Sequence, residues 1–530
     1  MTTGVFDGIV IGGGHNGLTL AAYMVLAGQR PLVLERNPWI GGGCTTDEPI
    51  IPGFRFNLHS NFYIGLENAP FLRDLELWRF GFSYVEPPVQ QGATFRDGTC
   101  IVIHKDVERT CASLARFSRH DAEAYRHLHA TWTESMRPLF TSLLYNAPLA
   151  PAELRARLTG PQGADLLSHA PLSLFEAVDR HFEDHRVKSF LKLFMHVTTA
   201  ENEPGTGLLF ASTMANITRL ALPVGGSSAL PQALARLIEA RGGHVETDAE
   251  VREIRVKGGR AVGVELADGR RFAARRFVAS AIDAPATMKL VGESAFPDEV
   301  RTKLNAWYWG SHSLLTIHLA LSEPPFYSSA KFDPDIDRAF NLFMGWDDTE
   351  QVIRCFDQCR RNELPDHLMG NGACNTRFDP GYAPAGKHSA FWWPFAPYAL
   401  PDGPEGWDRR RKEYTAQLLD VWRQYAPHLT DENVLASYLF TPLDVERRNR
   451  TMIRGAVRMG AYVPSQLGIN RPHPLLAGNR TPIEGLYLCG SSSHGGGVNG
   501  APAYNAANAI VDDLNLSRPW IPIEPPGWTG

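Results

Sequence analysis

The clearest pattern of apolar and polar positions lies at the start of the chain. Residues 7–11 form a short apolar run of the kind that makes a buried parallel strand. The apolar stretch 18–27 predicts a helix that Gly28 ends, and a second apolar run, 31–34, predicts another strand that stops at Glu35. A strand, a helix, a strand and an acid in this order are typical of a βαβ nucleotide-binding unit.

The turn between the first strand and the helix, residues 12–17, reads G-x-G-x-x-G. Gly12 permits the tight turn, Gly14 lets the backbone approach a pyrophosphate, and Gly17 lets the helix pack close to the strand. The helix N-terminus offers N–H groups and a positive dipole end to the phosphates. Glu35 is placed to accept hydrogen bonds from both ribose hydroxyls of an adenosine. The motif predicts NAD or FAD, and the acid argues against the 2′-phosphate of NADP.

Two later glycine clusters favour FAD over NAD. The cluster 41–43 follows the acid closely and lets the backbone pass beside a pyrophosphate and ribityl chain. Near the other end of the chain, 481–490 predicts a turn and a strand, 491–500 a glycine-dense loop, and about 503–514 a helix. This loop and helix N-terminus predict an anion or carbonyl-oxygen site. It would complete, at the flavin N1–O2 edge, the site that the N-terminus opens.

The middle of the chain predicts elements that return to the nucleotide domain. The segment 223–228 predicts small hydroxyl caps for a helix whose apolar residues share one face. A strand at 251–254 then precedes a β-hairpin made of 260–266 and 270–279. No second G-x-G-x-x-G follows a strand here, so a disulfide-reductase-like enzyme with its own NAD domain is not expected.

The Gly12–Glu35 fingerprint, the 41–43 segment and the 485–505 block together resemble the FAD oxidoreductases related to phytoene desaturase and carotenoid isomerase. The resemblance implies FAD as the cofactor. It also places the backbone near Val251 against the adenine, and the strand ending at Ala281 in the nucleotide domain. Carotenoid-type members usually carry His-Pro before their glycines, whereas a glycine follows His494 directly, so the motifs specify the cofactor more than the substrate.

The predicted fold class is α/β, with a discontinuous Rossmann-type FAD-binding domain and an inserted α+β substrate domain. Residues 1–85, 218–290 and 451–516 are predicted to form the FAD-binding domain, and 517–530 an extended C-terminal arm that packs on a neighbour. The blocks 86–217 and 291–450 are richer in aromatic residues and proline, and we interpret them as the substrate domain. The aromatic patch 391–395 is predicted to be core, with a pocket wall or a contact surface as the alternatives.

The residues predicted to bind FAD are Gly12, Gly14, His15, Asn16, Gly17, Glu35, Arg36, Gly42, Gly43, Cys44, Val251, Ala281, Gly490, Ser491, Gly497, Val498, Asn499 and Ala501. His59 and His494 are the predicted catalytic residues, because the resemblance runs the segment 54–63 under the isoalloxazine and the 491–500 loop beside it. The alternative for His59 is a buried, hydrogen-bonded imidazole, and for His494 a loop residue that bonds the cofactor or backbone. Covalent attachment of the flavin to His59 or Cys44 is not expected.

The leading hypothesis is an FAD-dependent oxidoreductase that moves hydride between the flavin and a bulky, largely apolar organic substrate, by desaturation, saturation or isomerisation. The flavin accepts hydride at N5, and a base or water takes the second proton. An FAD-dependent amine oxidase is the enzymatic alternative. A flavin-binding interaction protein without catalysis is the alternative from another class.

Composition narrows the setting. The chain of 530 residues is 44% hydrophobic and 21% charged with a net charge of −5, which excludes disorder, and it has no basic stripe for nucleic acid. Seven scattered cysteines without C-x-x-C predict free thiols, a cytoplasmic location and no metal site. No apolar stretch reaches the roughly 18 residues of a transmembrane helix. The stretch 139–149 is a candidate for peripheral membrane contact, and self-association is left open.

Overall fold

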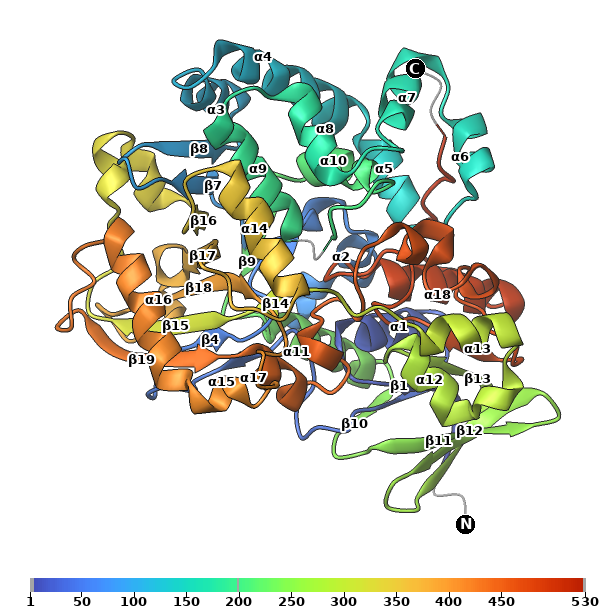
Figure 1. The fold of residues 1–530 in the computed structure, drawn as a ribbon. Helices are drawn as coiled ribbons and strands as arrows, with labels where there is room; N and C mark the ends of the chain where they lie inside the picture. The colour runs from blue at the N-terminus through green and yellow to red at the C-terminus, as the bar shows by residue number, and fades with distance from the viewer. Residues whose placement is uncertain (1–3, 198–199, 528–530) are drawn as a thin grey trace.

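The computed structural model describes residues 4–197 and 200–527. Figure 1 shows two large sheets side by side, with a group of helices across the top of the view. The fold is mixed α/β, as predicted. None of the helices in the described residues combines the length and the apolar character that a membrane crossing needs.

The first sheet, here called the nucleotide sheet, joins strands from three distant parts of the chain. Its order is β10-β2-β1-β13-β12-β11, and β20 pairs with β13. β1 pairs in parallel with β2 and β13, and β20 extends the parallel part. The strands are β1 (Gly4–Ile11), β2 (Pro31–Leu34), β10 (His244–Glu246), β11 (Val251–Lys257), β12 (Arg260–Leu266), β13 (Arg271–Ser280) and β20 (Leu486–Leu488).

Helices cover both faces of the nucleotide sheet. Successive side chains of a strand point to opposite faces, so Val10 packs with one group of helices while Ile9 and Ile11 pack with the other. The first group is α1 (His15–Leu26), α11 (Ala229–Ala240) and α18 (Ala501–Asp513). The second is α12 (Ala284–Val291) and α13 (Asp298–Asn305). This doubly covered parallel sheet opens the carboxyl ends of its strands toward a ligand site.

The second sheet is mostly antiparallel and has the order β19-β15-β18-β17-β16-β7-β8, with β14 paired to β18. Its strands are β7 (Val89–Thr94), β8 (Cys100–His104), β14 (Ser313–Leu314), β15 (Thr316–Leu321), β16 (Asn341–Met344), β17 (Gly370–Cys374), β18 (His388–Ala396) and β19 (Val434–Phe440). The aromatic patch 391–395 lies within β18 and is buried throughout, which confirms it as core. Trp393 also reaches the wall of the main cavity.

A helical cap lies above the junction of the two sheets (Figure 1). It consists of α3 (Val107–Leu114), α4 (Arg119–Leu128), a π-helix (His129–Ser135), α5 (Arg137–Leu144), α6 (Pro151–Arg157), α7 (Gly160–Ser168), α8 (Leu174–His181), α9 (His185–His196) and α10 (Gly207–Met214). The remaining elements are β3 (Thr46–Asp47), β4 (Phe56–Asn57), β5 (Tyr63–Ile64), β6 (Tyr84–Val85), β9 (Leu220–Pro223), α2 (Pro70–Leu75), α14 (Thr349–Arg360), α15 (Gly406–Arg409), α16 (Arg411–Tyr425) and α17 (Pro442–Arg448).

The predicted hydroxyl cap of α11 is wrong. Ser228 occupies the N-cap position, but its side chain makes no capping hydrogen bond to the helix. Its Oγ instead accepts a hydrogen bond of 2.7 Å from the backbone N–H of Thr46. A long-range partner therefore takes the acceptor that the local pattern assigns to the helix.

The C-terminal arm packs on its own chain, which corrects the expectation that it packs on a neighbour. The Trp520 ring lies 4.7 Å from the Tyr23 ring, and its Nε1–H donates to Asn508 Oδ1. The arm then runs up to the helical cap, where the C-terminus lies near α6 and α7 (Figure 1). There the Pro526 carbonyl accepts a hydrogen bond of 3.3 Å from Arg157 at the end of α6.

Candidate active site

One cavity of about 1110 Å³ joins the carboxyl ends of the nucleotide sheet to the helical cap. Pockets for a single small molecule usually measure roughly 300–1,000 Å³, so this one has room for a large ligand. One half of its wall carries glycine turns and polar groups. The other half, here called the leucine pouch, is built by the cap.

Glu35 marks the end of the cavity that lies beside β2. Its buried carboxylate accepts hydrogen bonds from the Gly13 N–H at 2.8 Å and the Asn37 N–H at 2.9 Å. Burial raises the pKa of this carboxyl group, while the two N–H donors act against that rise. A Cβ on Gly13 would lie 2.9 Å from the Cβ of Glu35, so glycine is needed at 13 for the acid to lie against the turn.

The two N-terminal glycine clusters pack backbone against backbone. Gly12 has a φ of +98°, and a Cβ on Gly17 would lie 2.0 Å from the Gly12 carbonyl oxygen. Gly14 and Gly41 form a β-bridge, and a Cβ on Gly42 would lie 3.2 Å from the Gly14 Cα. The resulting cradle presents backbone, with no side chain in between, to the cavity.

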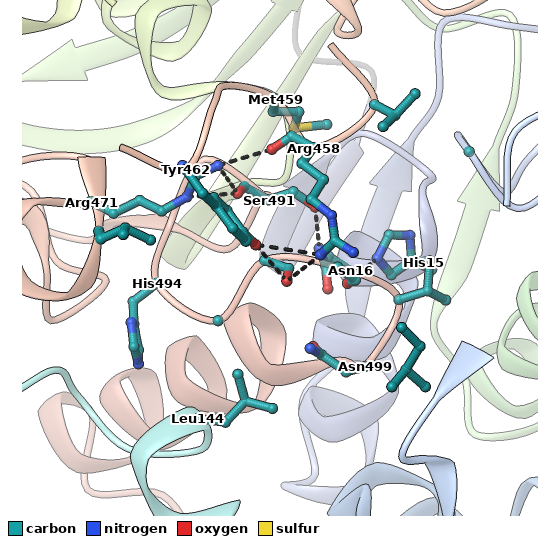
Figure 2. A pocket seen from close by; sticks show the side chains of 18 of the residues that line it. His15, Asn16, Leu144, Arg458, Met459, Tyr462, Arg471, Ser491, His494 and Asn499 are labelled. Carbon is teal, nitrogen blue, oxygen red and sulfur yellow. Dashed lines mark hydrogen bonds between the residues drawn. The ribbon is translucent and has the colours of Figure 1, made fainter. Parts of the chain in front are cut away.

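The two ends of the chain meet at this cradle. The His15 Nε2 lies 3.0 Å from the Gly497 carbonyl oxygen, and Asn16 Nδ2 donates to Ser491 Oγ at 3.2 Å (Figure 2). Burial lowers the pKa of His15 to about 4, so a neutral imidazole donates its N–H to that carbonyl. The predicted meeting of the N-terminal glycine turn and the C-terminal loop is confirmed.

Most of the predicted cofactor residues line the cavity; three do not. Those that line it are Gly12, Gly14, His15, Asn16, Gly17, Glu35, Arg36, Gly42, Gly43, Val251, Ala281, Ser491, Gly497, Val498 and Asn499. Cys44 is instead buried in the core beside Tyr63, and burial raises the pKa of its thiol to about 11. Gly490 and Ala501 lie behind the wall, against the Ile282 carbonyl and at the buried start of α18.

His59 lies in the wall of the cavity and differs from the hydrogen-bonded alternative. It is buried, but neither ring nitrogen has a hydrogen-bond partner among the described residues. Its ring meets the Phe440 ring edge to face at 5.3 Å. Burial, with a smaller effect of Arg448, lowers its pKa to about 3. The side chain is therefore a neutral imidazole with unused hydrogen-bonding capacity at the cavity.

His494 ties the C-terminal loop to the helical cap. Its Nε2–H donates to the Leu143 carbonyl of α5 at 2.8 Å, and burial lowers its pKa. Figure 2 shows the ring pointing away from Asn16 and toward Leu144. The Tyr145 hydroxyl makes a second tie, of 2.7 Å, to the Asn499 carbonyl. The alternative in which His494 bonds backbone describes its position.

The leucine pouch has walls from α5, α6, α7, α9 and α10. Its apolar lining comprises Phe140, Leu143, Leu144, Leu149, Leu154, Leu158, Leu166, Leu167, Phe194, Val197, Leu208 and Leu209. The apolar stretch 139–149, a candidate for membrane contact, supplies part of this lining. No residue of α6 is buried, although Leu154 faces the cavity, so this helix forms a thin wall between the pouch and solvent.

The pattern along the chain also missed Arg458, Tyr462 and Arg471, which surround the C-terminal loop (Figure 2). The Tyr462 hydroxyl donates to the Gly496 carbonyl at 2.9 Å, and the Arg471 Nη2–H donates to the Ser491 carbonyl at 2.9 Å. All three lie in a stretch with short 3₁₀ turns and no regular periodicity, so no local pattern marks them.

The comparisons with known proteins decide the family. The family model described as flavin containing amine oxidoreductase matches residues 17–511. The chain belongs to the flavin-containing amine oxidoreductase family. This flavoenzyme is therefore an FAD-dependent oxidoreductase, as the sequence predicts.

Two relatives and one solved structure describe its neighbourhood. The flavoenzyme is 30% identical to a component protein of the limonene dehydrogenase of Castellaniella defragrans, over 97% of this chain and 96% of that protein. It is 24% identical to the chloroplastic prolycopene isomerase 1 of an Oncidium hybrid, over 97% and 85%. The crystal structure of a Methanosarcina mazei oxidoreductase has the same fold, with a TM-score of 0.60, 18% identity and coverage of 95% and 99%.

Proposed function

We propose that this flavoenzyme transfers hydride between FAD and a bulky, largely apolar substrate held in the leucine pouch. The reaction changes a C–C bond by desaturation, saturation or isomerisation. The observation that carries the proposal is the continuity of the glycine cradle and the pouch within one cavity. The names of the relatives, a limonene dehydrogenase and a prolycopene isomerase, support an apolar substrate.

Buried polar atoms support the placement of FAD. Asn16 Oδ1 and both ring nitrogens of His59 are buried beside the cavity and have no partner among the described residues. A buried polar group normally finds a partner, and the polar groups of FAD would supply one. We assign the adenosine to Glu35, the pyrophosphate to the cradle at 12–17 and 42–43, and the ring half to the 491–499 loop.

The chain's own residues prepare the site for an apolar molecule. Asn61 lies in the cavity wall, but its side-chain amide exchanges hydrogen bonds with that of Asn375 at 3.1 and 2.6 Å. Asn341 in the wall is likewise bonded to Gln91 and Asn371. These amides use their hydrogen-bonding capacity on one another, so the substrate meets saturated polar groups and leucines.

Proton handling falls to the two histidines in our proposal. When bound, FAD supplies the hydride acceptor or donor. His494 donates its Nε2–H to α5, so the lone pair of the neutral ring is on Nδ1 and is available to a proton. The unpartnered imidazole of His59 orients a group in the cavity by hydrogen bonding. The thin wall of the cap keeps bulk water from the pouch.

An amine substrate is less well served by this cavity. The acidic residues that line it in the described part of the chain are Glu35, Glu250 and Asp283. All three flank strands of the nucleotide sheet, so no lining carboxylate belongs to the leucine pouch, where an ammonium group would need a partner. The domain boundaries, a cytoplasmic location, peripheral membrane contact and self-association stay predictions.

Glu35→Ala tests the adenosine assignment. Losing a charge-assisted hydrogen bond costs roughly 1.5–3 kcal/mol, so we expect FAD to bind about 10- to 100-fold more weakly. Titration of the apoprotein with FAD, followed by flavin fluorescence, measures the change. Glu253→Ala, an exposed acid on the same sheet, should leave the affinity unchanged. Equal FAD affinity in both variants would contradict the assignment.

Ser212→Trp tests the substrate assignment. Ser212 lines the cavity from α10, and an indole there would fill the pouch while leaving the cradle intact. We expect the variant to retain its FAD, and limonene or a carotenoid to bleach its flavin about 100-fold more slowly without air, since small misplacements have effects of this size. Ser168→Trp, on the exposed end of α7, should behave as the parent protein. Bleaching of the parent protein by amines alone would overturn the proposal.

A further inference from the structure

Arg471 is a charged group without a charged partner. It is 1% exposed, and its guanidinium donates only to backbone carbonyls: those of Ser491, Ala461, Gln466, Arg458 and Gly460. The rings of Tyr462 and Trp307 flank it, at 4.8 and 5.6 Å from the guanidinium carbon. Burial lowers its pKa to about 10, so it remains charged at neutral pH.

Arg458 places a second cation at the same loop. Its Nη1 lies 3.4 Å from the Gly496 carbonyl oxygen and 3.5 Å from the Tyr462 hydroxyl, which are long contacts for a guanidinium. A Cβ on Gly497 would lie 2.9 Å from this Nη1, so Arg458 fills the space that a side chain at 497 would occupy. Figure 2 shows its side chain above the loop that carries Asn499.

The charge of the two arginines is not balanced within the protein. Across residues 4–197 and 200–527, neither guanidinium lies within ion-pair distance of a carboxylate. Asp283, the acid nearest along the wall, caps α12 through the Ala286 N–H, and burial raises its pKa to about 6. The start of α18 adds its positive dipole end to the same region. A buried cation is costly without a counter-charge, so the site is built to receive a negative charge.

The order of features along the cavity shows which part of FAD meets these cations. Glu35 lies at one end, the glycine cradle follows, and the 491–499 loop touches the cradle through His15 and Asn16. Beyond the loop comes α5, tied to it by His494. A ligand with its adenosine at Glu35 and its pyrophosphate on the cradle therefore brings its ring to the loop that Arg458 and Arg471 support.

We propose that Arg458 and Arg471 form an electrostatic site that stabilises the negative charge of the reduced flavin ring and so raises its reduction potential. The inference rests on the proposed placement of FAD. Two electrons and one proton convert the neutral oxidised ring to the reduced anion, so only the reduced state gains from the two cations. Arg471 acts by its field, because its donors are used on carbonyls, and Arg458 faces the cavity directly.

The test compares Arg458→Met, which removes the charge, with Arg458→Lys, which keeps it. The reduction potential of the holoprotein is measured by equilibration with a redox dye, and FAD affinity by titration of the apoprotein. For Arg458→Met we expect the preference for reduced over oxidised flavin to fall about tenfold, which is about 30 mV for a two-electron couple. Arg458→Lys should restore most of the potential. Arg155→Met, which removes a cation that lines the pouch from α6, should leave the potential unchanged.

Arg471→Gln and Arg471→Lys repeat the comparison at the buried position. If the Gln variant does not fold, the Arg458 pair decides alone. A weaker FAD affinity with an unchanged potential would overturn the proposal, because it would assign the arginines to the pyrophosphate, whose charge is the same in both redox states. Unchanged potential and affinity would also overturn it. The dye measurement uses no substrate, so a failure of the apolar-substrate proposal leaves this result readable.

Discussion

Gly17→Ala is expected to yield a protein that binds FAD at least about 100-fold more weakly, or is isolated colourless. The added Cβ would lie 2.0 Å from the Gly12 carbonyl oxygen and 3.1 Å from the Ala281 Cβ. Backbone must move to relieve this contact, and overpacking of this kind costs roughly 1–3 kcal/mol or more. The start of α1 would then move away from the turn, and its N–H groups would no longer meet the pyrophosphate. The flavin absorbance of the purified protein, with FAD titration, measures the effect.

Gly28→Ala is the matched control at the other end of the same helix. Gly28 has a φ of +75°, but a Cβ there would meet nothing within 4 Å. The substitution therefore costs about 1 kcal/mol of backbone strain and leaves the cofactor site unchanged. A Gly17→Ala protein that keeps a full complement of FAD would contradict the close packing of α1 on the glycine turn.

Trp520→Ala is expected to lower the free energy of unfolding by about 3–5 kcal/mol. The indole is 4% exposed, packs on the Tyr23 ring at 4.7 Å and bonds Asn508 on α18. Because α1 and α18 each begin at one half of the FAD site, its loss also loosens the packing between them. Urea unfolding followed by far-ultraviolet circular dichroism measures the change, with FAD present at saturation.

The neighbouring residue provides the control. Ile521 is 74% exposed, so Ile521→Ala should change the free energy of unfolding by less than about 0.5 kcal/mol. If Trp520→Ala were as mild as Ile521→Ala, the arm would not be part of the folded core. An arm that instead holds two molecules together would make the effect of Trp520→Ala depend on protein concentration.

The elements around the first glycine turn could be predicted from the sequence because their signals are local. The apolar run, the glycines and the acid at 7–35 specify β1, α1 and β2 almost to the residue. The hairpin of β12 and β13 and the strand β20 are likewise marked by alternating positions and turn glycines. The meeting of 12–17 with 491–499 follows from family resemblance and is confirmed by the bonds of His15 and Asn16.

The features that could not be predicted depend on contacts far apart in the chain. The leucines of 139–149 are equally compatible with a membrane surface and a pouch, because hydropathy does not say what a side chain faces. Ser228 has the right position for a cap, but Thr46 competes for its oxygen. Arg471 looks like any surface arginine until five carbonyls from loops without periodicity close around it.

The joining of the two chain ends at the cradle has a consequence for biosynthesis. His15 waits for Gly497, 482 residues later, and Asn16 for Ser491. A nascent chain still on the ribosome has the first glycine turn but neither the loop that closes the site nor the arm that holds α1 and α18 together. The protein therefore acquires its colour only after translation ends, and prematurely terminated products remain colourless and open to proteolysis.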